Sequence, residues 1–279
     1  MNSISKKIEI SGYGSPFSHD VCSCTGEIPL HFNWVFDRPS SSGIEVYMDY
    51  GIRHALNSSN KFKYLWLCES KTIVPQENDF VRNNIDFLAE TFRKIFVHDE
   101  NLLNLGSIFE YVPPAANFTW IKNRKIYKKS KMLSMISSGK GFTEGHRFRN
   151  TFMNKQMHLN PWINFFGRGF KPFLTKEEAL ADFRFSITME NESYSNYYTE
   201  KLMDCFATGT IPVYHGTPKL SDMFNKEGVI ILDQYFDPND LSEDLYQSKS
   251  HAIKENFDRC LLHEKSDDVL FRKIMDDIN

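Results

Sequence analysis

The sequence predicts an α/β protein that contains two parallel β-sheets, each covered by helices. Short apolar runs alternate with helical patterns along most of the 279 residues. The run at residues 64–68 is apolar throughout, which is typical of a strand buried on both faces of a parallel sheet. The alternation stops at residues 113–116, where two prolines precede two alanines, and it resumes at Met132. This interruption divides the chain into two halves.

The first half has the pattern of a small parallel sheet. A strand at residues 8–10 runs into a loop with Gly12 and Gly14, which is either a phosphate-binding loop or a turn that faces a cleft. The elements expected after it are a helix at 42–56, a strand at 64–68, a helix at 80–92, a strand at 94–97, a helical turn at 101–105 and a strand at 109–112.

A basic stretch separates the halves, with six lysines and arginines between residues 122 and 131. A mobile linker is the simpler interpretation, and attraction of an anion is the alternative. Beyond it we expect strands at 132–136, 163–166, 185–189, 211–214 and 229–232, and helices at 148–157, 176–183, 200–208 and 261–278.

Composition excludes several classes of protein. Hydrophobic residues make up 41% of the chain and aromatic residues 14%, which indicates a globular protein with substantial cores. The formal net charge of −3 argues against a dedicated nucleic-acid-binding protein. No apolar run approaches the ~20 residues of a membrane span, and the first residues lack the apolar core of a signal peptide. The five cysteines lack the paired spacing of a zinc site. Reduced thiols then indicate a soluble cytoplasmic protein, with peripheral attachment to a membrane as the alternative.

The most informative stretch covers residues 185–216. An alternating strand ends on Glu190 and Asn191, and Thr199 then caps a helix whose first turn carries Glu200 and Lys201. Ligands of open α/β sheets bind at the carboxyl ends of the strands, where helix N-termini point. A carboxylate there suits a sugar hydroxyl, and a lysine suits a phosphate. An ordinary β-α-β crossover with solvated charges is the alternative interpretation.

Three segments of this stretch resemble the donor-binding signature of the family 10 glycosyltransferases, the α-1,3/4-fucosyltransferases. They are residues 189–191, Met-Glu-Asn; residues 197–201, Tyr-Tyr-Thr-Glu-Lys; and residues 209–216, Gly-Thr-Ile-Pro-Val-Tyr-His-Gly. Methionine replaces the usual phenylalanine of the first segment. The resemblance implies a GT-B fold, in which two Rossmann-like domains face a central cleft and the nucleotide sugar binds the second domain.

The domain prediction follows from this resemblance and from the interrupted pattern. Residues 1–118 are expected to form a Rossmann-like domain on the acceptor side, and residues 119–131 a basic linker. Residues 132–252 are expected to form the Rossmann-like domain that binds the nucleotide sugar. Residues 253–279 are expected to form C-terminal helices that pack back on the first domain.

The resemblance also implies roles for residues of the second half. The segment Arg147-Phe148-Arg149-Asn150 resembles the family's helix start, whose arginine binds the diphosphate. The resemblance assigns that role to Arg149, with Arg147 as the second candidate. Lys201 resembles a second phosphate ligand, and Glu200 the carboxylate that binds the sugar or ribose. Further contacts to the nucleotide sugar are expected from Lys140, Asn191 and Tyr197, while Glu190 holds the loop in shape.

The base that accepts a proton from the acceptor hydroxyl is expected in the first half. Glu69 follows the strand at 64–68, as the family's proposed base follows its strand, although the flanking residues differ from the family's Gly-Glu-Asn. A carboxylate beside apolar walls has a raised pKa, which suits proton abstraction. His98 and Asp99, at the end of the next strand, are the rival candidates.

The predicted function is therefore inverting transfer of a sugar from a nucleoside diphosphate to a hydroxyl of a glycan. GDP-fucose is the family's default donor, and a UDP-sugar such as UDP-xylose is the alternative. A catalytically inactive module that binds a nucleotide or a glycan is the alternative of another class. The chain contains no Asp-x-Asp motif, so we expect cationic side chains in place of a metal, and no cofactor besides the nucleotide sugar.

Overall fold

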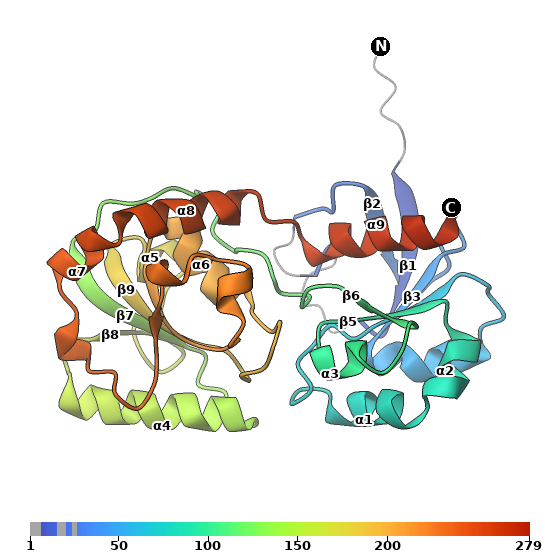
Figure 1. Ribbon diagram of the computed structural model, residues 1–279, viewed down its shortest axis with the longest axis horizontal. Helices are drawn as coiled ribbons and strands as arrows, with labels where there is room; N and C mark the ends of the chain where they lie inside the picture. The colour runs from blue at the N-terminus through green and yellow to red at the C-terminus, as the bar shows by residue number, and fades with distance from the viewer. Residues whose placement is uncertain (1–6, 16–20, 24–26) are drawn as a thin grey trace, which may run out of the picture. The chain divides into compact units, whose positions relative to one another are not determined.

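The computed structural model describes residues 7–15, 21–23 and 27–279, and the chain divides into two units (Figure 1). Unit 1 combines Met1–Asn117 with Glu264–Asn279, and unit 2 is Phe118–His263. Each unit contains one parallel β-sheet with helices on both faces, as the sequence predicts.

The sheet of unit 1 has six strands in the order β2-β1-β3-β4-β5-β6, and neighbouring strands run parallel. The strands are β1 Ile8–Tyr13, β2 Phe32–Phe36, β3 Glu45–Met48, β4 Lys63–Trp66, β5 Lys94–Val97 and β6 Phe109–Tyr111. The helices are the 3-10 helix η1 Asp49–Asn57, α1 Pro75–Asn83, α2 Ile85–Thr91, α3 Glu100–Leu103 and α9 Ser266–Ile278.

Alternate residues of each strand divide the core of unit 1 into two layers. Val46 and Trp66 belong to the layer that α9 covers, and Leu270 of α9 lies in the same cluster. Tyr47 and Leu65, one residue along, belong to the cluster formed with η1, α1 and α2. In Figure 1, α9 and the α1–α2 pair accordingly lie on opposite faces of this sheet.

Three parts of unit 1 differ from the sequence-based prediction. The single helix expected at residues 80–92 is in fact two helices, α1 and α2, which are separated at Asn84. The helix expected at residues 42–56 is in fact the strand β3 followed by η1, because Val46, Tyr47 and Met48 are buried on both faces of a central strand. Such a strand has no polar alternation, so its pattern is easily taken for that of a buried helix. The prediction also missed β2, although its exposed Asn33 between Phe32 and Trp34 gives a period-2 signal.

The sheet of unit 2 has five parallel strands in the order β11-β10-β9-β7-β8. They are β7 Lys131–Ser137, β8 Asn164–Gly167, β9 Phe183–Met189, β10 Ile211–His215 and β11 Ile230–Ile231. All of β9 is buried, as suits the central strand. The helices are α4 Glu144–Leu159, α5 Glu177–Leu180, α6 Glu200–Thr208, α7 Glu243–Ser248 and α8 Ser250–Leu261, with 3-10 turns η2 Leu220–Asp222, η3 Lys226–Gly228 and η4 Pro238–Asp240.

This division differs from the sequence-based domain boundaries in two ways. The basic stretch at 119–131 belongs to unit 2, because the ammonium of Lys129 donates to the carbonyls of Ala181 and Thr208 at 3.0 and 2.8 Å. The C-terminal helices separate, since α8 belongs to unit 2 and only α9 belongs to unit 1.

Helix α9 is joined to the rest of unit 1 by polar contacts at both of its ends. Near its start, the buried carboxylate of Asp267 accepts hydrogen bonds from the Ser23 hydroxyl and, at 2.7 Å, from Trp34 Nε1. Near its end, Asp277 pairs with Arg93 at 2.6 Å. The two ends of the chain therefore contribute to one folded unit.

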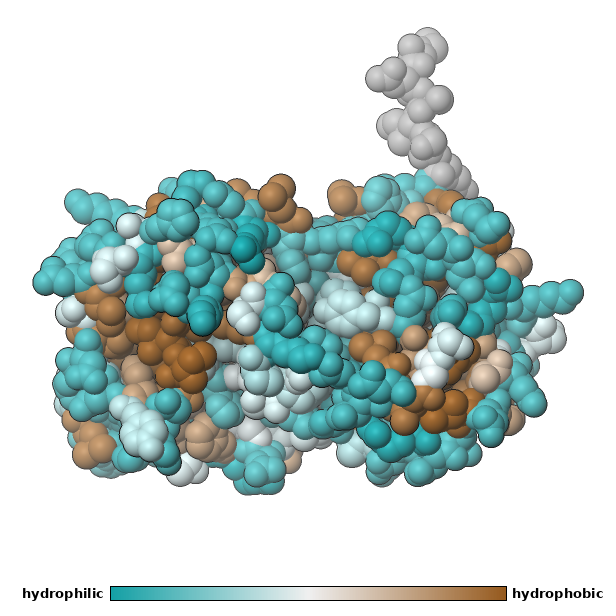
Figure 2. Space-filling model, in the orientation of Figure 1, coloured by the Kyte–Doolittle hydropathy of each residue, from teal (hydrophilic) through white to brown (hydrophobic). Residues whose placement is uncertain are grey.

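The buried cysteines and the surface of the protein do not by themselves establish its cellular location. Cys22, Cys68, Cys205 and Cys260 are buried thiols, while Cys24 lies outside the described residues. Hydrophilic side chains cover most of the visible face, with smaller hydrophobic patches between them (Figure 2). Within the described ranges, the helices all fall short of the length and apolar character needed to cross a bilayer. The cytoplasmic location stays a prediction.

Asp267 should make the stability of unit 1 depend on pH. Burial raises the pKa of this carboxyl from 3.8 to about 6, although hydrogen bonds from Ser23 and Trp34 oppose the shift. The folded chain thus binds the proton more tightly than the unfolded chain, so Asp267 stabilises the fold less as the pH rises through this interval. We expect the difference in unfolding free energy between the wild type and Asp267→Asn to fall across it and then level off. Urea denaturation at several pH values measures this difference, and a constant or rising difference would contradict the prediction.

Candidate active site

The carboxyl end of β9 is fixed to the start of α6 by one buried side chain, Glu190. Its residue is 1% exposed, and its carboxylate accepts hydrogen bonds from the N–H and the hydroxyl of Thr199 at 2.8 and 2.7 Å. Thr199 also caps α6 by accepting the N–H of Lys201 at 3.4 Å. Glu190 therefore sets the place where the N-terminus of α6 begins.

Lys201 adds a cation to this helix start. Its ammonium lies 2.9 Å from the Thr199 hydroxyl and 3.2 Å from the Glu190 carboxylate. Burial acts to lower the pKa of Lys201, but Glu200 and Glu190 outweigh it and raise the pKa overall. The side chain is still 26% exposed, so a charged donor at the helix N-terminus remains accessible to an anion.

Glu200 is held as an ionised acceptor by lysines on either side. Its carboxylate lies 3.4 Å from the ammonium of Lys176 and 3.8 Å from that of Lys201. Burial alone would raise the pKa of Glu200, but these two cations and hydrogen bonds lower it to about 2. A carboxylate in this state accepts hydrogen bonds from hydroxyl groups and donates none.

Lys176 and Asp204 support Glu200, and the sequence analysis missed both. The Lys176 ammonium donates to Asp204 at 2.6 Å, and the second oxygen of Asp204 accepts the Thr119 hydroxyl and the Trp120 N–H, each at 2.7 Å. Asp204 lies four residues after Glu200 and therefore shares its face of α6. This spacing of four residues was the sequence signal that could have identified Asp204 as a neighbour of Glu200.

The N-terminus of α4 packs against the loop that follows β9. Thr143 and His146 cap this helix reciprocally, with contacts of 3.1 and 3.3 Å. Residue 145 must be glycine, since a Cβ there would lie 2.0 Å from the carbonyl oxygen of Asn191. Two helix N-termini, those of α4 and α6, thus flank the carboxyl end of the central strand.

Arg149 extends from α4 into this edge of the sheet. It is 5% exposed and donates from Nη1 to the carbonyl of Met189 at 3.3 Å, while its buried Nε has no hydrogen-bond partner among residues 7–15, 21–23 and 27–279. Burial lowers the pKa of Arg149, and Glu190 and Glu200 offset part of the shift. A buried guanidinium with an unused donor is suited to an anionic ligand.

The other predicted residues of unit 2 divide into two groups. Tyr197 is buried and stacks on Tyr194 at 5.0 Å. Lys140 and Arg147 are exposed, and Arg147 donates to the carbonyl of Phe142 at 3.3 Å. The structure therefore brings together Arg149, Glu190, Glu200 and Lys201. The backbone of Asn191 lies against the start of α4, and Lys140 and Arg147 are surface residues.

His146 is a neighbour that the sequence analysis did not identify. Burial, followed by the charges of Arg149, Lys140 and Lys201, lowers the pKa of His146 to about 4. The imidazole is therefore neutral near pH 7 and adds no fourth charge. Three cations, Arg149, Lys140 and Lys201, therefore act on this one ring.

In unit 1, Glu69 lies at the carboxyl end of the sheet, just beyond β4. It is half-buried, and its N–H donates to Asp49 at 3.3 Å. Asp49 follows β3, is fully buried and also accepts the N–H of Cys68 at 3.0 Å. The sequence analysis missed Asp49 because it placed this residue inside a helix.

The rival bases are less accessible than Glu69. His98 and Asp99 are 3% and 4% exposed. Burial lowers the pKa of His98 to about 4. Asp99 caps α3 by accepting the N–H of Asn101 at 2.9 Å. These environments favour Glu69 as the group that a substrate hydroxyl reaches.

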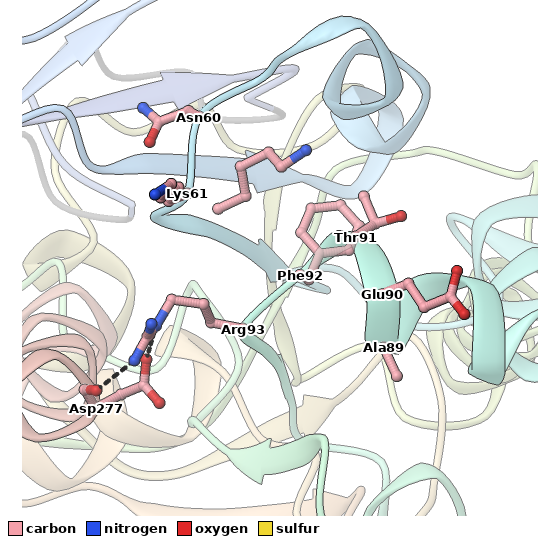
Figure 3. Close-up of a pocket in the computed structure, with 9 residues that line it drawn as sticks. Asn60, Lys61, Ala89, Glu90, Thr91, Phe92, Arg93 and Asp277 are labelled. Carbon is pink, nitrogen blue, oxygen red and sulfur yellow. Dashed lines mark hydrogen bonds and ion pairs between the residues drawn. The ribbon is translucent and has the colours of Figure 1, made fainter.

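A pocket at the opposite, amino-terminal edge of the same sheet has a different character (Figure 3). Its cations serve the fold, since Lys63 donates to the carbonyl of Ser58 at 2.8 Å and Arg93 pairs with Asp277. Helix N-termini point to the other edge, so we do not include this pocket in the site. Its lining residues are Asn60, Lys61, Lys63, Ala89, Glu90, Thr91, Phe92, Arg93 and Asp277.

Comparison with solved structures establishes the fold class of the protein. A crystal structure of an α1,3-fucosyltransferase superposes with a TM-score of 0.51 at 14% identity, covering 99% of this chain and 92% of that one. A crystal structure of TarM gives a TM-score of 0.54 at 14% identity, covering 85% of this chain and 54% of that one. Two parallel α/β units with these neighbours define a GT-B fold, as predicted.

The sequence of unit 2 resembles one family. Residues 126–257 match the model of the C-terminal part of glycosyltransferase family 10 (fucosyltransferase), which confirms the predicted resemblance over this segment. The alpha-(1,3)-fucosyltransferase FucT of Helicobacter pylori is 34% identical over 55 residues, 20% of this chain and 12% of that protein. The GDP-fucose protein O-fucosyltransferase 3 of Bos taurus is 31% identical over 64 residues, 23% of this chain and 13% of that protein. The matched segments thus span a small part of either relative.

Replacing Glu190 by glutamine should destabilise unit 2. The amide nitrogen would face donors that now meet a carboxylate oxygen, leaving buried groups of Thr199 unpaired, at a cost of about 1–3 kcal/mol of unfolding free energy. Chemical denaturation measures this loss. Glu144→Gln, an exposed change on α4, is the control and should stay within ~0.5 kcal/mol of wild type. Equal stability of the two variants would show that Glu190 does not hold the loop.

Proposed function

We propose that the protein is an inverting glycosyltransferase that moves fucose from GDP-fucose to a hydroxyl of a glycan acceptor. The observation that carries the proposal is the meeting of Arg149 and Lys201 with two helix N-termini at the end of β9. This arrangement lies inside the segment that matches family 10. It supplies what a departing nucleoside diphosphate requires, which is fixed positive charge and N–H donors.

Charge neutralisation of the diphosphate is the first step of the proposed mechanism. As the bond to the sugar breaks, negative charge grows on the terminal phosphate. The buried Nε of Arg149 and the accessible ammonium of Lys201 would contact it, with Lys140 and Arg147 as surface cations nearby. In this proposal these side chains take the place of a metal ion.

Acidic and polar groups at the same sheet edge of unit 2 are proposed to recognise the sugar nucleotide. Glu200, ionised and anchored by Lys176, would accept hydrogen bonds from hydroxyls of the sugar or the ribose. Asn191 and Tyr197, from the loop between β9 and α6, are proposed as further contacts to the donor. Glu190 is not a ligand in this proposal, because its carboxylate is already committed to Thr199 and Lys201.

Glu69 of unit 1 is the proposed base. It would take the proton from the acceptor hydroxyl while the oxygen attacks the anomeric carbon from the side opposite the leaving group. The new glycosidic bond forms as the bond to GDP breaks, so the anomeric configuration inverts. Support for Glu69 comes from its place at a strand end and from its greater accessibility than His98 and Asp99.

The choice of donor is supported by two relatives. A crystal structure of an α1,3-fucosyltransferase with GDP-fucose superposes with a TM-score of 0.50 at 15% identity, covering 95% of this chain and 84% of that one. The Bos taurus relative is likewise described by its use of GDP-fucose. These likenesses favour GDP-fucose over a UDP-sugar.

Titration of the purified protein with GDP, UDP and their fucose and xylose conjugates tests the donor. Ligand at about 100 times Kd should add roughly 2.7 kcal/mol to stability, and we expect this effect from GDP and GDP-fucose. Arg149→Lys should weaken GDP binding about tenfold or more, because a lysine cannot reproduce the guanidinium fork. Arg147→Lys, two residues away and exposed, is the matched control and should change it less. Preference for UDP would overturn the named donor, and binding of neither nucleotide would overturn the proposal.

Glu69→Gln should abolish catalysis and spare donor binding. Without the base, release of GDP from GDP-fucose, with water or a glycan as acceptor, should fall by about 10²–10⁴-fold. Calorimetry should find GDP affinity nearly unchanged, since the nucleotide contacts are proposed in unit 2. Asp99→Asn tests the rival and should retain most of the activity. Full activity of Glu69→Gln would remove Glu69 from the mechanism.

A further inference from the structure

Asp49 occupies an unusual position for a carboxylate. It is fully buried where β3 passes into η1, and its φ of 30° is in the region that side chains other than glycine, asparagine and aspartate rarely adopt. Its two oxygens accept the N–H groups of Cys68 and Glu69 at 3.0 and 3.3 Å. A strained and desolvated acid therefore directs both oxygens to the backbone of one neighbouring strand end.

The backbone around Asp49 is closely packed by two glycines. A Cβ at Gly51 would lie 2.3 Å from the carbonyl oxygen of Tyr13, and one at Gly14 would lie 2.2 Å from the Gly51 nitrogen. The loops after β1 and β3 are thus in direct backbone contact, which leaves Asp49 little freedom to move. Its carboxylate accepts hydrogen bonds from the N–H groups of Cys68 and Glu69, so the backbone of these two residues is held as well.

Other acidic side chains lie close enough to Asp49 to interact with it electrostatically. Burial, then the charges of Glu69 and of Glu77 on α1, raise the pKa of Asp49 well above its usual value. Burial raises the pKa values of the Tyr50 phenol and the Cys68 thiol as well, and the charges of Asp49 and Glu69 add to both shifts. The repulsion between the Asp49 and Glu69 carboxylates is mutual, so the two groups titrate as a coupled pair.

We propose that Asp49 is a positioning residue for Glu69: its carboxylate holds the Cys68–Glu69 backbone and so fixes the direction in which the Glu69 side chain leaves the sheet edge. The inference rests on the proposed role of Glu69 as the base. Asp49 itself, fully buried, does not touch the substrate.

Asp49→Asn tests the inference, because asparagine has the same shape and tolerates the same φ. Its amide nitrogen would face one of the two N–H donors, and its charge is lost. We measure release of GDP from GDP-fucose, with water as acceptor, as a function of pH. The expected result is a fall in kcat of tenfold or more, a shift of the acidic limb of the profile to lower pH, and a KM for GDP-fucose within about twofold of wild type. Asp79→Asn, an exposed change on α1, should leave all three unchanged.

Parallel measurement of Glu69→Gln separates the two ideas. If Glu69→Gln is inactive while Asp49→Asn keeps the kcat and pH profile of wild type, the role of Asp49 is overturned and that of Glu69 stands. If Glu69→Gln is fully active, the base assignment fails and the inference fails with it. Should Asp49→Asn not fold, Asp49→Gly relieves the strained φ and removes the carboxylate. Loss of kcat with intact GDP binding in that variant supports the inference, and unchanged kcat overturns it.

Discussion

The buried carboxylate of Glu190 is the interaction on which unit 2 depends. Removing a charge from water is costly, and the structure offsets this cost with two hydrogen bonds from Thr199 and an ion pair to Lys201. One side chain therefore joins the end of the central strand to the first turn of α6. The N-terminus of α6 faces the sheet edge because Glu190 holds it there, and every proposed donor contact near α6 depends on that geometry.

From this point a network of alternating charges runs deeper into unit 2. Lys201 lies beside Glu200, Glu200 beside Lys176, and Lys176 beside Asp204, which ends on the backbone of Trp120. Each member has an opposite charge next to it, so none is buried unpaired. Such a network is oriented before a ligand arrives, and groups that need no reorganisation stabilise a transition state most effectively. The network thus contributes both to the stability of the unit and to its proposed chemistry.

The sequence predicts local features well and distant contacts poorly. Residues 185–216 contain a strand, a capped helix and a second strand in continuous order, so their sequence alone places Glu190 and Lys201 at one edge. Lys176 reaches Glu200 from a separate segment, and no nearby pattern announces that contact. The sequence analysis missed Asp49 for a different reason. The strand before it, β3, is buried on both faces and shows no polar alternation, so this segment was assigned to a helix.

The two sheet edges carry different charged groups, which suit the two halves of the proposed glycosyl transfer. The edge of unit 2 carries Arg149 and Lys201, and burial together with these cations lowers the pKa of His146 to about 4. The edge of unit 1 carries Asp49 and Glu69, and burial together with the charge of Glu69 raises the pKa of Asp49. A departing diphosphate needs the first environment and a hydroxyl that must lose a proton needs the second. Because these charged groups lie on separate units, a change that strengthens one environment does not weaken the other. A single edge that held all five groups could not separate the two environments.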